Sequence, residues 1–134
     1  VNRGDSAARA ESIRQMKTTL SQNISVMLAP EGTFNMTSQP LKSFYDGAFR
    51  IAIETQTPIK PVLFLDTHDR MNQHSIFSLN PGRSRSVFLE EVPVTGLNLH
   101  DVEDLKRRVY KIMEEALISY KVSWIKTSEH ASAG

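Results

Sequence analysis

The feature of this sequence that most constrains its fold is a pair of short apolar runs on either side of a segment with helical spacing. Residues 24–29 (ISVMLA) and 59–66 (IKPVLFLD) have the length and the continuous apolar character of strands that are covered on both faces. Between them, residues 43–56 place apolar side chains at helical intervals. Strand, crossover helix and strand predict an α/β fold with a largely parallel sheet flanked by helices.

One further helix is predicted on each side of this unit. Asp5 or Ser6 can cap a helix that runs to about residue 21. Residues 102–120 have the most regular apolar stripe in the chain, and Asp101 stands near the start of that stripe. These helices would cover the faces of the predicted sheet.

The segment before the last helix predicts a hairpin or an edge extension of the sheet. The runs 74–79 and 86–92 flank the sequence NPGRSR, whose Pro-Gly pair is a strong turn signal. We expect residues 1–125 to be the C-terminal part of a single domain that is truncated on its N-terminal side. Residues 126–134 form a small polar tail that we expect to be disordered.

Composition excludes several classes of protein. Sixteen basic and fifteen acidic residues give a formal net charge of +1, which argues against a protein devoted to a long nucleic-acid backbone. The chain has no cysteine, and its four histidines lack a paired helical spacing, so neither a thiol nucleophile nor a metal site is expected. No stretch approaches the ~20 apolar residues that span a bilayer.

The loop after the first apolar run is the candidate site. Pro-Glu-Gly-Thr at 30–33 follows that run directly, and ligands of α/β sheets bind outside the carboxyl ends of strands. Gly32 would let backbone amides approach an anion closely. Taken alone, Glu31 is more simply a turn residue or a helix-cap partner than a reacting group.

Four sequence blocks occur in a fixed order: VNR at 1–3, VMLAPEGT at 26–33, FYDGAF at 44–49 and PIKPVLF at 58–64. Their order and spacing resemble the later motif blocks of the glycerolipid acyltransferase family. Within that family the chain is most similar to the 1-acyl-sn-glycerol-3-phosphate (lysophosphatidic acid) acyltransferases. The resemblance extends from residue 1 to about residue 120.

The resemblance implies an enzyme of phosphatidic acid synthesis that works on the cytoplasmic side of the cell membrane. Such enzymes move a fatty acyl group from acyl carrier protein or coenzyme A to the free hydroxyl of lysophosphatidic acid, and they need no further cofactor. In the family, the His of an H-x-x-x-x-D motif takes the hydroxyl proton and the Asp orients that His.

The H-x-x-x-x-D motif is absent, because none of the four histidines is followed by Asp five residues later. In the family this motif lies upstream of the VNR block, and the chain begins with Val1. We therefore expect a soluble fragment that is inactive on its own and that contains the acceptor-binding half of the site.

The resemblance also assigns roles to individual residues. Arg3 matches the family's arginine that contacts the acceptor phosphate, a role that suits the paired donors of a guanidinium. Glu31, Gly32 and Thr33 match the block that shapes the acceptor site. Pro61 matches a later proline-containing strand, for which we favour a structural role in the wall of the site.

The chain departs from the family pattern in two places. The family often has Arg-Ser after Glu-Gly-Thr, where this chain has Phe34 and Asn35, and it often has lysine in place of Tyr45. Two phosphate-binding cations are therefore missing, and Lys42 or Lys60 could replace them.

Two alternative functions follow. One is an acyltransferase for another lyso-lipid, such as an ornithine-linked lipid. Another is a non-catalytic α/β domain that binds a phosphate or a partner protein through the Gly32 loop. Arg83 and Arg85 could also contact anionic headgroups, although we favour an exposed basic turn.

Overall fold

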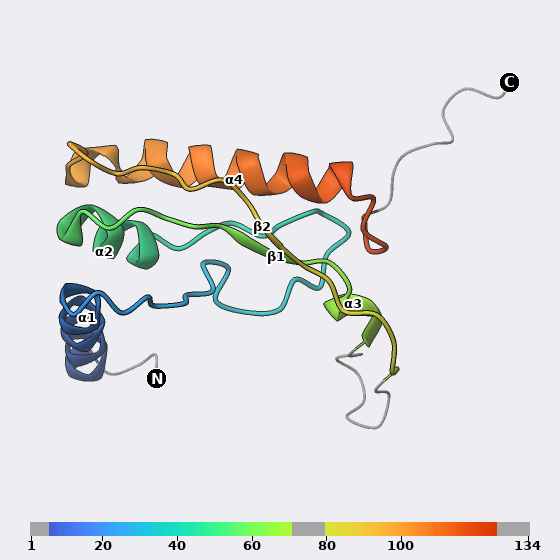
Figure 1. The fold of residues 1–134 in the computed structure, drawn as a ribbon, viewed down its shortest axis with the longest axis horizontal. Helices are drawn as coiled ribbons and strands as arrows, with labels where there is room; N and C mark the ends of the chain where they lie inside the picture. The colour runs from blue at the N-terminus through green and yellow to red at the C-terminus, as the bar shows by residue number, and fades with distance from the viewer. Residues whose placement is uncertain (1–5, 71–79, 126–134) are drawn as a thin grey trace, which may run out of the picture.

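The computed structural model describes residues 6–70 and 80–125. Figure 1 shows α4 lying along one side of the molecule, α2 and the two strands in the middle, and α1 below α2. The predicted tail and the run 74–79 lie outside the described residues. In chain order the elements are α1 (Ser6–Ser21), α2 (Gly47–Thr55), β1 (Val62–Phe64), α3 (Thr67–Arg70), β2 (Ser86–Phe88), the 3-10 turn η1 (Leu99–Asp101) and α4 (Val102–Ser119).

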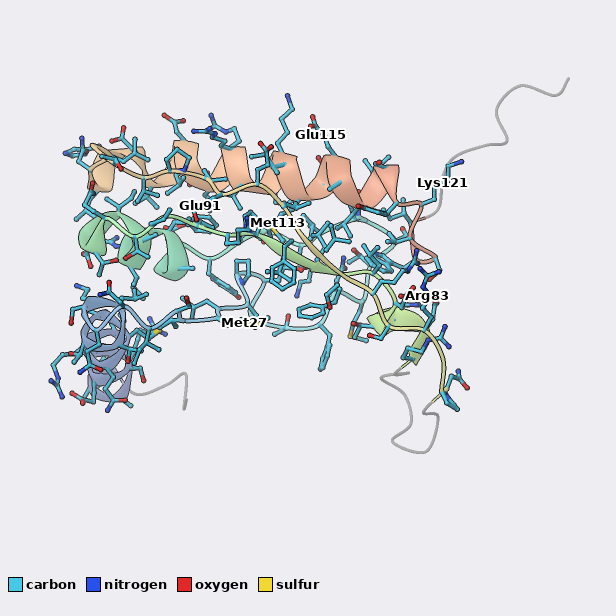
Figure 2. The ribbon with its side chains drawn as sticks, viewed as in Figure 1. Met27, Arg83, Glu91, Met113, Glu115 and Lys121 are labelled. Atoms are coloured by element: carbon cyan, nitrogen blue, oxygen red, sulfur yellow. The ribbon has the colours of Figure 1, made fainter. Side chains whose placement is uncertain are left out.

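The first and last predicted helices are confirmed as α1 and α4. Helix α1 buries none of its side chains and contacts α2, to which it is joined by an ion pair between Lys17 and Glu54. Helix α4 is amphipathic, and Figure 2 shows Met113 pointing toward the strands while Glu115 points away from them. The buried face of α4 consists of Val102, Leu105, Val109, Met113 and Leu117.

Helix α2 begins later than the sequence predicts. Its spacing seemed to include Phe44, but the helix starts only at Gly47. The backbone N–H of Tyr45 donates instead to the carbonyl oxygen of Pro30, at 2.9 Å. This bond holds the preceding residues against another loop, while the Phe44 ring is buried in the core. Gln56 ends the helix in a left-handed conformation, with φ of 51°.

The sheet in the described residues is a two-stranded antiparallel ribbon, so the predicted parallel sheet does not appear there. The run that begins at Ser86 pairs with β1 and so extends the sheet at its edge, one of the two arrangements predicted for it; the run 74–79, its partner in the other arrangement, lies outside the described residues. Beyond the end of β1, the N–H of Leu65 donates to the carbonyl oxygen of Arg85 at 3.0 Å, which continues the antiparallel pairing. The paired residues are Val62 with Phe88, Leu63 with Val87 and Phe64 with Ser86.

Pro61 determines where the ribbon begins. Ile59 and Val92 exchange both backbone hydrogen bonds, but they form only an isolated bridge. Leu89 donates to the carbonyl oxygen of Pro61 at 3.0 Å, and Pro61 has no N–H to return the bond. Regular pairing therefore starts at Val62, after a bulge in which two residues face one.

The prediction of a buried strand at 24–29 is wrong for this structure. The segment has no regular secondary structure, and Met27 is 72% exposed. Within the described residues, no backbone hydrogen bond joins 25–28 to another segment. An apolar run becomes a strand only when a neighbouring edge accepts its N–H and C=O groups, and here the nearest edge lies across a groove.

Two neighbouring residues of α4 test the assigned buried face. Leu117 is 3% exposed and Ile118 is 53% exposed. We expect Leu117→Ala to lower the free energy of unfolding by roughly 2–5 kcal/mol, because it leaves a cavity. Ile118→Ala should change it by less than about 0.5 kcal/mol. Urea denaturation of both variants measures this, and equal losses would contradict the assignment.

Candidate functional site

The candidate loop turns sharply at Gly32. This glycine has a φ of 66°, in the left-handed region that residues with a Cβ rarely adopt, and its N–H donates to the carbonyl oxygen of Ala29 at 3.1 Å. The turn places Glu31 and Thr33 on either side of the glycine. Both side chains then accept hydrogen bonds from Lys42, in the segment 40–45.

The segment 40–45 is bonded directly to this loop. The Glu31 carboxylate accepts a hydrogen bond from the backbone N–H of Lys42, with 2.8 Å between Oε2 and N. The carbonyl oxygen of Pro30 accepts the bond from Tyr45 described above. Two backbone N–H groups of one segment are thus satisfied by two adjacent residues of the loop.

The ammonium group of Lys42 lies at the same loop. Its Nζ donates to the hydroxyl oxygen of Thr33, and the side chain is half-buried. Lys60 lies elsewhere, because it precedes β1 and lines a groove at the start of that strand. Of the two lysines that could replace the missing family cations, the structure brings Lys42 to the Glu31–Thr33 loop.

Two aromatic side chains hold the segment 40–45 from the opposite side. The hydroxyl of Tyr110, on α4, donates to the carbonyl oxygen of Leu41 at 3.2 Å. The indole N–H of Trp124 donates to the carbonyl oxygen of Pro40 at 3.4 Å. The Tyr110 ring also meets the Phe44 ring edge-on, with 5.1 Å between centroids.

Neither Tyr110 nor Trp124 was predicted to contact the site. Tyr110 follows Val109 on α4, within a stripe that predicts core packing, and nothing in the pattern separates a packing residue from one that donates a hydrogen bond. Burial raises the pKa of the Tyr110 hydroxyl, and the negative charges of Glu114 and Glu31 raise it further. The phenol therefore stays protonated and able to donate at neutral pH.

Asp66 and Arg85 form an ion pair just beyond the C-terminal end of β1. Asp66 is 6% exposed and accepts three kinds of bond from Arg85: from its backbone N–H at 2.8 Å, from Nε at 2.9 Å and from Nη2 at 2.7 Å. The side-chain bonds from Arg85 lower the pKa of Asp66 to about 2, against the opposing effect of burial. Arg83 is exposed, as an exposed basic turn predicts, whereas the Arg85 side chain is 40% exposed and paired with Asp66.

A groove of about 250 Å³ separates the first apolar run from β1. Its walls come from residues 25–28, from α2 and from residues 57–62, and Val109 and Met113 of α4 also line it. Most of these side chains are apolar. Pro61 is buried in the wall between the groove and the strand pair.

The remaining residues predicted for the site fall into two groups. Arg3 lies outside the described residues, so its position relative to the loop stays a prediction. Phe34 and Tyr45, where the family often has cations, are both largely exposed. Their rings supply no positive charge to the loop.

Comparison with known proteins decides the family. The family model described as Acyltransferase matches residues 1–65. The chain is 32% identical over 102 residues to "1-acyl-sn-glycerol-3-phosphate acyltransferase alpha" of Mus musculus, covering 76% of this chain and 35% of that protein. The chain belongs to the glycerolipid acyltransferase family.

Two other relatives agree with this assignment. "1-acyl-sn-glycerol-3-phosphate acyltransferase" of Haemophilus influenzae is 30% identical over 95 residues, which are 71% of this chain and 38% of that protein. "1-acyl-sn-glycerol-3-phosphate acyltransferase beta" of Homo sapiens is 31% identical over 97 residues, which are 72% of this chain and 34% of that protein. The chain thus spans only about a third of the length of these relatives.

No solved structure matches the chain at a significant level. Among residues 6–70 and 80–125, no helix is long and apolar enough to cross a bilayer.

The Asp66–Arg85 pair predicts a specific dependence of stability on pH. The folded-state pKa of Asp66 lies below the usual value of about 3.9. The contribution of the pair to the free energy of unfolding is therefore complete above about pH 4 and is lost as the pH falls toward 2. We expect Asp66→Asn to lower the melting temperature at pH 7, and this difference to shrink between pH 4 and pH 2.

Asp104→Asn is the matched control, because Asp104 lies exposed on α4 and pairs only with Arg107 in the described residues. It should leave the melting temperature nearly unchanged at every pH. Thermal unfolding followed by circular dichroism gives both curves. A difference between Asp66→Asn and the wild type that stayed constant down to pH 2 would contradict the pairing.

Proposed function

We propose that the full-length protein transfers a fatty acyl group from an acyl carrier protein or coenzyme A thioester to the free hydroxyl of lysophosphatidic acid. This chain would contribute the acceptor-phosphate half of the site. The observation that supports the proposal most is the position of the Lys42 ammonium beside Thr33, on the loop that matches the family's Glu-Gly-Thr block.

The loop has the chemistry to bind a phosphate monoester. An ammonium has three N–H donors, and Lys42 uses one of them on Thr33, so two remain for phosphate oxygens. The Thr33 hydroxyl can rotate its own hydrogen toward the same phosphate while it accepts from Lys42. Arg3 would add a paired donor from the other side. Glu31 would repel a phosphate, but its Oε2 atom is committed to the Lys42 N–H.

The reaction itself would need residues that this chain does not contain. The acceptor hydroxyl oxygen attacks the thioester carbonyl carbon, and the upstream His of H-x-x-x-x-D removes the hydroxyl proton. The carbon–sulfur bond then breaks, and the departing thiolate takes up a proton as the ester forms. The contribution of this chain is to hold the phosphate and so orient the hydroxyl. A lipid acceptor of this kind would place the enzyme at the cytoplasmic face of a membrane.

We further propose that the first apolar run and β1 are parallel neighbours in the sheet of the full-length protein. In an antiparallel pair, hydrogen-bonded and non-bonded residue pairs alternate, so the N–H and C=O groups of Val62 and Phe64 point away from β2. The Val62 end of that edge lines the groove, and residues 25–28 line its other side. Figure 1 shows both segments running away from the end of the molecule where α1 and α2 lie.

One observation favours a second candidate function, an acyltransferase for a different lyso-lipid. Phe34 and Tyr45 stand where the family often has cations, and both side chains are exposed beside the loop. A headgroup with less negative charge than a phosphate monoester would need fewer cations. An ornithine-linked lyso-lipid belongs to this class.

Acyl transfer by the full-length protein tests the proposed acceptor site. We expect Lys42→Ala to raise the Michaelis constant for lysophosphatidic acid roughly ten- to hundredfold, because it removes one charge-assisted hydrogen bond of about 1.5–3 kcal/mol. Arg3→Ala should have a similar effect. Lys60→Ala is the matched control and should leave this constant unchanged.

The acyl donor should be varied in the same assay, using acyl carrier protein and coenzyme A thioesters in turn. Activity with another lyso-lipid but not with lysophosphatidic acid would favour the second candidate. No activity with any acceptor would favour a non-catalytic phosphate-binding or partner-binding domain. Equal effects of Lys42→Ala and Lys60→Ala would contradict the assigned site.

Hydrogen–deuterium exchange of the full-length protein tests the parallel pairing. If residues 26–28 pair with β1, their amides should exchange much more slowly than those of the exposed loop at 36–38. Mass spectrometry of peptides from both regions measures the difference. Exchange at the same rate in the two peptides would contradict the proposal.

A further inference from the structure

A single peptide group in the candidate site is held from both sides. The carbonyl oxygen of Leu41 and the N–H of Lys42 belong to the same peptide unit, whose atoms lie close to one plane. Tyr110 donates to that carbonyl oxygen at 3.2 Å, and Glu31 accepts from that N–H at 2.8 Å. In a trans peptide these two groups point in opposite directions, so the two side chains approach from opposite sides.

Both partners are themselves held in place. Tyr110 lies in the middle of α4, beside the buried Val109, and its ring packs edge-on against Phe44. Glu31 precedes the left-handed turn at Gly32, which fixes the direction of its backbone. The hydrogen bonds therefore connect the core helix to the loop through one peptide plane.

We propose that Tyr110 and Glu31 are positioning residues that fix the Leu41–Lys42 peptide and thereby set the Lys42 ammonium at Thr33. The proposal rests on the proposed function, because Lys42 is the residue that would bind the acceptor phosphate. Fixing the peptide plane fixes the position of the Lys42 Cα, and the bond from Tyr45 to Pro30 further along the segment limits the rotation about N–Cα that turns the Cα–Cβ bond. The ammonium then needs to lose only side-chain freedom when the phosphate binds, which lowers the entropy cost of binding.

This role also accounts for Glu31 without a proton transfer. Its carboxylate is half-buried and bonded to a backbone N–H. An amide N–H is too weakly acidic to take part in proton transfer during the reaction. A glutamine would still offer an oxygen to that N–H, whereas an alanine would leave it unpaired. The two substitutions therefore separate a positioning role from a chemical one.

The first experiment is steady-state acyl transfer by the full-length protein carrying Tyr110→Phe. This change removes the hydroxyl and keeps the ring. We expect the Michaelis constant for lysophosphatidic acid to rise about fivefold, the change that one average neutral hydrogen bond corresponds to. The turnover number and the Michaelis constant for the acyl donor should not change. Tyr120→Phe is the matched control, because Tyr120 is an exposed tyrosine at the end of the same helix.

A double-mutant cycle with Lys42→Ala separates positioning from a general effect on folding. If Tyr110 acts through Lys42, then Tyr110→Phe should have no further effect once the ammonium is gone. Fully additive effects, or a lower turnover number with both constants altered, would overturn the proposal. Glu31→Gln should keep the turnover number and should not raise the acceptor constant, because it keeps an oxygen for the Lys42 N–H and removes a charge that repels phosphate, whereas Glu31→Ala should raise the acceptor constant. Loss of turnover in Glu31→Gln would show that Glu31 takes part in the chemistry and would overturn its assigned role.

Hydrogen–deuterium exchange provides a readout that does not depend on the acceptor. Tyr110→Phe and Glu31→Ala should each speed up exchange in the peptide that covers residues 40–45, and Tyr120→Phe should not. If exchange responds in this way while lysophosphatidic acid is not a substrate, the positioning of the Leu41–Lys42 peptide by Tyr110 and Glu31 is confirmed and the proposed acceptor is wrong. If exchange in residues 40–45 does not respond, the proposed positioning by Tyr110 and Glu31 is wrong whatever the acceptor is.

Discussion

Burial of one face of α4 is the constraint on which the other elements depend. Five side chains at intervals of three and four residues pack into the shared core with α2 and the strands. Each contributes roughly 1.5–3 kcal/mol when it is fully removed from water. A two-stranded ribbon is marginal in water by itself, and the nine residues of α2 are fewer than the ~12–15 that an isolated helix needs. Both elements are stable here because α4 covers them.

The same helix links the core to the candidate site. Val109 is buried against the apolar groove, and the next residue, Tyr110, bonds to the segment that contains Lys42. Moving α4 by one turn would shift Tyr110 by about 5.4 Å, far beyond the reach of a hydrogen bond. The packing register of α4 therefore also sets the geometry of the loop, so substitutions in the core can alter binding without touching the site.

The sequence was informative where an element forms its backbone hydrogen bonds within itself. It was less informative where those bonds need a partner that is distant in the sequence. The helical spacing in α4 predicted its bounds closely, because helical hydrogen bonds are local. The run 24–29 has equally apolar residues, but a strand depends on a neighbour that no local pattern specifies. The loop at Glu31 was found from its motif. The choice of Lys42 over Lys60 and the role of Tyr110 depend on contacts across 9 and 69 residues, which spacing cannot reveal.

The turn between the strands has a consequence for natural variation. The guanidinium of Arg70 lies against Gly82, where a Cβ would overlap it, and Arg70 Nε donates to the carbonyl oxygen of Arg83 at 2.9 Å. Because the obstacle is the end of a flexible side chain, a larger residue at position 82 would displace Arg70 rather than unfold the ribbon. Homologues in which position 82 is not glycine should therefore be free to lose the arginine at position 70, so that these two positions change together during evolution.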